Sequence, residues 1–253
     1  MLVILPVMIV LGILAGSFAN YLSDVLPQTR GLSMPVCQQC NQTLGVTRYL
    51  LLQPCQNCEA KRSTRSWIVQ IFYPIAFVYL TFFSSNRLGM WIGAGLLFYF
   101  GLVVIMDLEY RIILNPISLA GAVIGAFIGL YLHGWKITLL GGIAGFGIMW
   151  ILYFLGVIYL RYLSKKRGEA IDEVALGFGD VNLAGVLGLI LGWPGITAGL
   201  LFAILIGGLV SGAYIVFSLI SKRYRPNTAI PYAPFLILGA MLLLYRPILF
   251  PIP

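Results

Sequence analysis

Long runs of apolar residues dominate this chain, and short polar segments separate them. A helix needs about 20 predominantly apolar residues to cross the hydrocarbon layer of a bilayer. The runs predict eight membrane-spanning segments, at residues 1–22, 67–84, 88–106, 116–133, 137–160, 181–193, 196–220 and 230–249. The stretch 181–193 is short for a crossing and also fits a re-entrant or tilted half-helix that lines a cavity.

The composition excludes an ordinary soluble domain. Of the 253 residues, 60% are apolar and only 9% are charged, and the mean hydropathy is +0.96; soluble domains carry about 25% charged residues. We therefore predict an all-α polytopic membrane protein with a first transmembrane helix (1–22), an extramembrane segment (23–66) and a multi-helix membrane domain (67–253). Because residues 1–19 begin without a basic region, we expect the first helix to stay in the mature protein.

The distribution of charge predicts the orientation. Cytoplasmic loops carry an excess of Lys and Arg. If segment 23–66 is cytoplasmic, all basic residues except Arg87, Lys136 and Arg246 lie inside, as do all eight acids, and both termini face outward. Topology and anionic lipid headgroups then explain the net charge of +8, so no nucleic-acid partner is expected.

All four cysteines of the chain lie in the extramembrane segment, as two CxxC pairs: Cys37 with Cys40, and Cys55 with Cys58. Two such pairs at this spacing offer four thiolates in the arrangement that Zn²⁺ prefers. Two disulfides are the alternative, but a reducing cytoplasm disfavours them. We predict a structural zinc site, because four cysteine ligands leave no open coordination position.

Several kinds of catalysis are excluded by missing residues. His133 is the only histidine, and it lies in a predicted outward loop, so a Ser-His-Asp or Cys-His mechanism has no base. Neither an HExxH motif nor a phosphate-binding glycine loop occurs. Carboxylate chemistry is what remains.

Asp107 and Asp180 stand out among the acids by their position. Asp107 directly follows an apolar run, and Asp180 ends the sequence Gly177-Phe178-Gly179-Asp180 just before another. Two carboxyl groups that meet at one membrane face share a proton and supply one base and one acid, as in aspartyl proteases. Gly177 and Gly179 would allow unusual backbone angles and close approach of an extended substrate to Asp180.

Other interpretations of these acids remain open. Asp180 could be a helix N-cap, and Asp107 could pair with Arg111 four residues further on. We interpret Glu109, Asp172 and Glu173 as interface or loop acids near basic residues. The two aspartates could also form a proton or cation relay in a transporter, although they lie at predicted span ends rather than near the midplane.

Taken together, these motifs resemble those of the bacterial type IV prepilin peptidases, a group of GxGD membrane aspartyl proteases. The resemblance covers nearly the whole chain: it includes the paired CxxC motifs, Asp107-Leu108, and the three motifs Gly16-Ser17-Phe18-Ala19-Asn20, Gly177-Phe178-Gly179-Asp180-Val181-Asn182-Leu183 and Pro231-Tyr232-Ala233-Pro234-Phe235. The resemblance implies that Asp107 and Asp180 are catalytic.

The resemblance also implies the substrates. These are prepilins or pseudopilins, whose short basic leader precedes a hydrophobic helix and is cut at the cytoplasmic face of the bacterial inner membrane. A second implied activity methylates the new N-terminus with S-adenosylmethionine, and it would involve Gly16, Ser17 and Asn20. Contact with pilus or type II secretion assembly machinery is implied as well.

This chain departs from the family pattern in places. Asn182 stands where the family usually has lysine, Ala233 replaces a glycine, and Pro116 follows the first aspartate later than usual. These departures leave the aspartates in place, but they bear on substrate choice and methyl transfer. The sequence is also compatible with a non-enzymatic scaffold that docks through its zinc segment, and with a presenilin-like protease whose aspartates lie deeper in the membrane.

Overall fold

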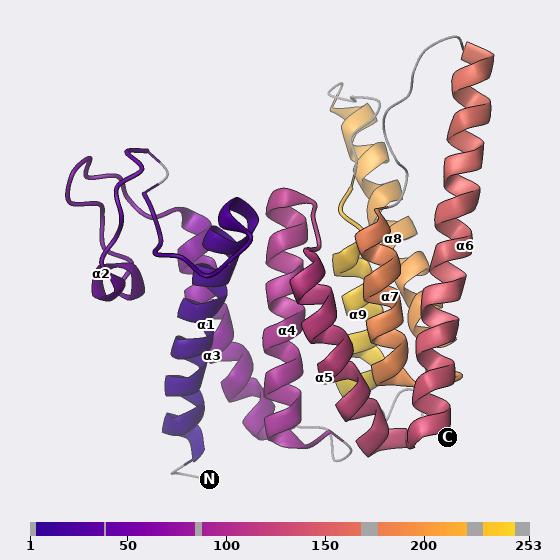
Figure 1. Cartoon of the computed structure of the whole chain (residues 1–253), viewed down its shortest axis with the longest axis horizontal. Coiled ribbons are helices and arrows are strands. Elements are labelled where there is room, and N and C mark those ends of the chain that lie inside the picture. The colour runs from indigo at the N-terminus through magenta and orange to yellow at the C-terminus, as the bar shows by residue number, and fades with distance from the viewer. Residues whose placement is uncertain (1–3, 38, 84–87, 168–176, 222–229, 246–253) are drawn as a thin grey trace. The chain divides into compact units, whose positions relative to one another are not determined.

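The computed structural model describes residues 4–37, 39–83, 88–167, 177–221 and 230–245. In these ranges the regular secondary structure is helical apart from one isolated β-bridge between Val36 and Thr43, and loops and turns connect the helices. The helices are shown in Figure 1. They are α1 (Ile4–Thr29), α2 (Val46–Leu50), α3 (Thr64–Phe83), α4 (Gly89–Tyr110), α5 (Asn115–His133), α6 (Trp135–Arg167), α7 (Phe178–Leu191), α8 (Gly195–Ile220) and α9 (Ala233–Tyr245).

Each of the eight predicted spans coincides with one of these helices, which confirms the predicted fold class. Six helices in the described ranges are long and apolar enough to cross a membrane, namely α1, α3, α4, α5, α6 and α8. The other two apolar helices, α7 and α9, have 14 and 13 residues. At 1.5 Å per residue α7 is about 21 Å long, less than the roughly 30 Å hydrocarbon thickness, as expected from the short apolar stretch 181–193.

The chain divides into two compact units, Met1–Ile105 and Met106–Pro253. The boundary lies within α4, whereas the sequence suggested boundaries at residues 22 and 66. The predicted orientation rests partly on charged residues that lie outside the described residues. These are Arg87, Glu169, Asp172, Glu173, Lys222, Arg223, Arg225 and Arg246.

In the first unit, α1 packs closely against α3. A Cβ atom at Gly16 would lie 3.2 Å from Cα of Gln70, and Asn20 donates a 3.0 Å hydrogen bond to the carbonyl of Ser66. The helix α1 continues to Thr29, beyond the predicted end at residue 22. Asp24, which ends the apolar run, lies within this helix and pairs with Arg62 and Arg65.

In the second unit, α7 is the central helix. It contacts α5, α6, α8 and α9, and in Figure 1 it runs alongside the long α6. Most of its residues are buried, and Val181, Leu183, Ala184 and Ile190 are fully buried. A helix that is apolar all round is suited to such a position, because it has no face that must meet water.

Glycines bring α6 and α7 into backbone contact. A Cβ atom at Gly188 would collide with the carbonyl oxygen of Gly141, and one at Gly145 would collide with that of Ala184. Small residues at such contacts let helices approach closely inside a membrane. The abundance of glycine in this chain therefore serves helix packing here.

We expect Gly188→Ala to destabilise the protein by about 1–3 kcal/mol, because the added methyl group must push α6 and α7 apart. Gly208→Ala on α8 is the matched control, since a Cβ atom there meets nothing within 4 Å. Thermal unfolding of the detergent-solubilised protein measures both. Equal unfolding temperatures for the two variants would show that this contact does not limit stability.

Candidate active site and metal centre

Asp107 lies in the last turn of α4 and is 6% exposed. Its Oδ2 accepts a 3.1 Å hydrogen bond from the backbone N–H of Ala233, the first residue of α9. The first N–H groups of a helix have no partner within the helix, and the helix dipole favours a negative charge there. The start of α9 therefore holds the Asp107 carboxylate in one orientation.

Asp180 lies in the first turn of α7 and is 8% exposed. The residue at the N-cap position is Gly177, and no side chain caps this helix. The alternative in which Asp180 is a helix N-cap is thus wrong. Its carboxyl group is available for another role, and it remains near the positive end of the helix dipole.

Segments that are distant in the sequence converge around the two aspartates. The carboxyl groups of Asp107 and Asp180 interact electrostatically, and Asp180 also interacts with the phenol of Tyr232, next to Ala233. A Cβ atom at Gly179 would lie 3.0 Å from Cβ of Ile113, so the start of α7 packs directly on the loop that follows α4. All of these residues belong to the second unit.

One of the two roles expected of the motif glycines does not hold at Gly177. Gly177 has φ −74° and ψ 144°, an extended conformation that any residue adopts. A Cβ atom there would lie 3.5 Å from Oδ2 of Asp180. The expectation of unusual backbone angles is wrong for Gly177, and its lack of a side chain instead leaves the space beside the carboxylate open.

The ion pairs within 4.0 Å among the described residues join Asp24 to Arg62 and Arg65. Neither includes Asp107, so no ion pair within 4.0 Å joins it to Arg111, although the charge of Arg111 still interacts electrostatically with the Asp107 carboxyl group. Two buried carboxyl groups without a direct cationic partner cannot both ionise easily, because like charges repel strongly in a medium of low polarity. Such a pair can share one proton and present a base and an acid together.

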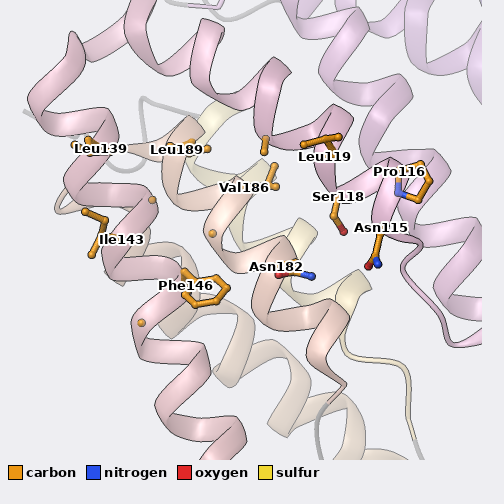
Figure 2. A pocket seen from close by; sticks show the side chains of 14 residues that line it. Asn115, Pro116, Ser118, Leu119, Leu139, Ile143, Phe146, Asn182, Val186 and Leu189 are labelled. Carbon is orange, nitrogen blue, oxygen red and sulfur yellow. The ribbon is translucent and has the colours of Figure 1, made fainter.

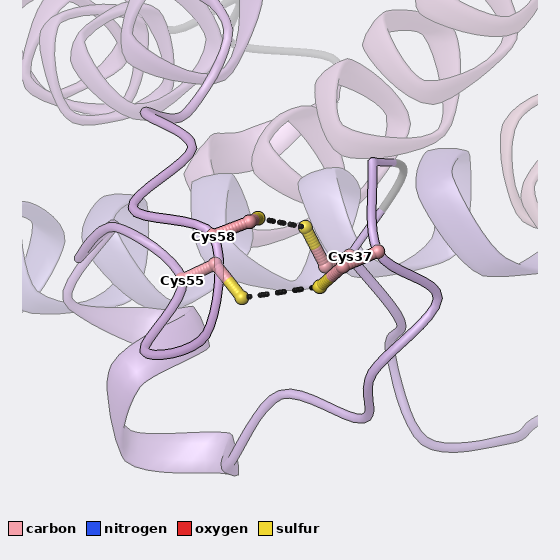
Figure 3. A group of neighbouring side chains, drawn as sticks. Cys37, Cys55 and Cys58 are labelled. Atoms are coloured by element: carbon pink, nitrogen blue, oxygen red, sulfur yellow. Dashed lines mark hydrogen bonds between the residues drawn. The ribbon is translucent and has the colours of Figure 1, made fainter.

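The four cysteines form one cluster in the first unit, with all sulfur atoms within 4.8 Å of one another. Figure 3 shows the two closest pairs: Cys37 and Cys58 with sulfurs 3.5 Å apart, and Cys40 and Cys55 with sulfurs 3.6 Å apart. A disulfide needs about 2.05 Å. Tetrahedral Zn–S bonds of about 2.3 Å place sulfurs about 3.8 Å apart, so the four residues fit Zn²⁺ and not two disulfides.

Backbone N–H groups point at these sulfurs. Donors from Cys58 and Asn57 lower the pKa of Cys55 to about 6, and donors from Cys40 and Gln39 lower the pKa of Cys37. Lowering the pKa favours the thiolate, which is the form that binds a metal. The local fold of each CxxC turn therefore prepares its first cysteine as a ligand.

A polar cluster that the sequence analysis missed anchors the cysteine segment to the helices. Asp24 of α1 accepts hydrogen bonds from the hydroxyl of Tyr49 at 2.5 Å and from Arg62 at 3.1 Å, and it pairs with Arg65 of α3. The Arg62 guanidinium also lies 4.1 Å from the centre of the Tyr49 ring. Burial and the negative charge of Asp24 raise the pKa of Tyr49, so its hydroxyl remains a donor.

The residues predicted to contact a methyl donor are packed between helices. Asn20 is fully buried, Ser17 is 6% exposed, and Gly16 lies against Gln70. Ser17 donates a 3.2 Å hydrogen bond to the side-chain oxygen of Gln70. Oδ1 of Asn20 is buried there without a hydrogen-bond partner. The contact of these three residues with S-adenosylmethionine stays a prediction.

The membrane helices contain a segment that matches a known family. Residues 91–212 match the type IV leader peptidase family. This segment begins in α4, ends in α8 and contains both Asp107 and Asp180.

Curated relatives match along most of the chain, and the following three are all named prepilin leader peptidase/N-methyltransferase. The Aeromonas salmonicida protein is 23% identical, covering 90% of this chain and 78% of that protein. The Pectobacterium carotovorum protein is 28% identical over 92% of this chain and 89% of its own length, and the Bacillus subtilis protein is 26% identical over 94% and 92%. No solved structure matches significantly. The chain is accordingly similar to the type IV leader peptidase family over residues 91–212, and to curated prepilin leader peptidase/N-methyltransferases over most of its length.

Proposed function

We propose that this protein removes the leader peptide from prepilins or pseudopilins, with Asp107 and Asp180 as the catalytic pair. The observation that carries the proposal is the convergence of two buried aspartates from different helices inside the segment that matches the family. The names of the relatives support the choice of substrate.

In the proposed mechanism the ionised aspartate removes a proton from a water molecule, whose oxygen attacks the scissile carbonyl carbon. The protonated aspartate gives its proton to the carbonyl oxygen, which yields a gem-diol intermediate. The proton that the other aspartate took from water then passes to the leaving amine as the C–N bond breaks, and a gem-diol hydroxyl returns one proton to the pair. The N–H of Ala233 keeps Asp107 oriented during these transfers. Burial keeps bulk water out of the pair and strengthens its electrostatic interactions.

We place the reaction at the cytoplasmic face of the bacterial inner membrane. The excess of basic residues predicted on that side supports this orientation. Asp107 is in the last turn of α4 and Asp180 in the first turn of α7, so both lie at helix ends. This position suits a junction between a basic leader and an apolar helix better than it suits an ion relay near the bilayer midplane.

The four-cysteine cluster would hold a structural Zn²⁺ through Cys37, Cys40, Cys55 and Cys58. The ion would cross-link the two CxxC turns of a segment that has only a small apolar cluster of its own. Methylation of the new N-terminus by S-adenosylmethionine is the second proposed activity, and the names of the relatives support it.

The proposal is tested by co-expressing this protein with a prepilin and measuring the mass of the pilin N-terminus. We expect loss of the leader, and addition of one methyl group to the new amine if both activities are present. An unmethylated mature pilin would restrict the function to the peptidase. A panel of prepilins and pseudopilins that all keep their leaders would contradict the proposed function.

A further inference from the structure

A groove with a volume of about 970 Å³ lies between α5, α6 and α7 in the second unit. Apolar side chains form most of its wall, and none of the residues that line it is charged. Figure 2 shows it from close by, with Leu119 on α5, Ile143 on α6 and Leu189 on α7. The groove therefore suits an uncharged, apolar occupant.

The groove also has a polar region, made by Asn115 and Ser118 of α5 and Asn182 of α7. In Figure 2 the side chains of Ser118 and Asn115 lie across from the amide of Asn182. Ser118 is 9% exposed, and its hydroxyl oxygen is buried without a hydrogen-bond partner. Leaving a buried hydroxyl without a partner is unfavourable, and a bound molecule could supply the missing hydrogen-bonding group.

The polar region lies near the start of α7, the helix that carries Asp180. Asn182 follows Asp180 by two positions on α7, so the two side chains project from different sides of the helix. Asn115 begins α5 just after the loop on which Gly179 packs. A segment that leaves the groove at this end would pass the first turn of α7 to reach Asp180.

The chemistry of the groove matches the first turns of an apolar helix. The first four N–H groups of any helix have no partner within it, and the side-chain oxygens of Asn115, Ser118 and Asn182 can accept hydrogen bonds from them. The apolar wall would then contact the side chains that follow. Gly147 on the groove wall, where a Cβ atom would meet nothing within 4 Å, allows another helix to approach closely.

We propose that this groove binds the apolar helix that follows the scissile bond of the substrate, and that Asn115, Ser118 and Asn182 bind its first turn. The inference rests on the proposed peptidase function and adds a substrate-binding surface to it. It also assigns a role in substrate specificity to Asn182, at a position where the family usually carries lysine. The positive end of a helix dipole lies at its N-terminus, so a neutral amide can bind the first turn of the substrate helix without the repulsion that a lysine would cause.

Photo-crosslinking tests the proposed occupant directly. A benzophenone amino acid replaces Leu119 or Ile143 in the full-length Asp180→Asn protein, in liposomes with a purified prepilin. Both positions are well exposed, as is the control position Leu209 on α8. We expect adducts from the two groove positions that map to the apolar helix of the prepilin. Adducts of equal yield from Leu209, or groove adducts with lipid alone, would overturn the proposal.

Filling the groove provides a second, independent measurement. A Cβ atom at Gly147 meets nothing within 4 Å, so Gly147→Leu can place its side chain in the groove without displacing a neighbour. We expect KM for prepilin to rise about tenfold or more, which corresponds to losing the contact of about one large apolar side chain. Gly208→Leu is the control, because that glycine is also open but lies on α8, outside the groove.

The outcomes separate the two proposals. If the wild-type protein cleaves prepilin and Gly147→Leu leaves KM unchanged or lowers kcat alone, the groove does not bind the substrate helix and the peptidase function stands. If the wild-type protein cleaves none of the prepilins tested, the proposed function itself fails.

Discussion

Replacing Asp180 by asparagine is expected to reduce prepilin cleavage by about 10²–10⁴-fold, the range that a positioned acid or base contributes. Asparagine has nearly the same shape as aspartate but can neither take up nor release the proton. Asp107→Asn should cause a loss of similar size, because its Oδ1 can still accept the hydrogen bond from Ala233 while the acid–base function is gone. Mass spectrometry of the pilin N-terminus after timed incubation measures the rate.

Glu109→Gln is the matched control for both variants. Glu109 lies two residues after Asp107 in the same helix, and its side chain is exposed. The substitution removes the same charge from the same end of α4 and should leave the cleavage rate within about twofold of wild type. If Glu109→Gln lowered the cleavage rate as much as Asp107→Asn does, the negative charge at this end of α4, rather than the aspartate pair, would control the reaction.

The second large effect is expected at the cysteine cluster. The wild-type protein, purified without chelator, should carry about one Zn²⁺ per chain, and the double variant Cys37→Ser/Cys55→Ser should carry almost none. Structural zinc binding supplies about 10–16 kcal/mol in small zinc-binding peptides. We therefore expect the segment between Val36 and Ala60 to become sensitive to limited proteolysis, since little else holds the two CxxC turns together.

The control for this change is Gln53→Ser, an exposed position between the two CxxC turns. It should retain both zinc and resistance to protease. A wild-type protein that contains no zinc under these conditions, or a double variant that keeps its full zinc content, would contradict the assignment of the cysteines as ligands.

The membrane helices could be predicted from the sequence because composition alone decides them. An apolar run must lie in lipid or in a protein core, and a backbone in lipid must form a helix to satisfy its hydrogen bonds. All eight predicted spans therefore coincide with helices. The end of α1 could not be predicted in this way, because the helix continues past the apolar run to Thr29, where Asp24 forms long-range pairs with Arg62 and Arg65.

The candidate site was partly predictable for the same reason. Asp107 and Asp180 could be selected because acids at the ends of apolar runs are rare. The cysteine site could be predicted because the spacing within and between the two CxxC pairs is typical of a four-cysteine metal site. The hydrogen bond from Ala233 to Asp107 joins residues 126 positions apart and has no local signal. The groove beside Asn182 was also hidden, because it is formed by three helices whose packing only the structure provides.

The most direct test of the shared catalytic pair compares kcat/KM for wild type, Asp107→Asn, Asp180→Asn and the double variant on one purified prepilin, with enzyme in excess. Residues that act as one unit show strongly non-additive losses. We expect each single variant to lose nearly all activity and the double variant to lose hardly more. A single variant with near wild-type cleavage, or a double variant whose loss is the product of the two single losses, would contradict a shared catalytic pair.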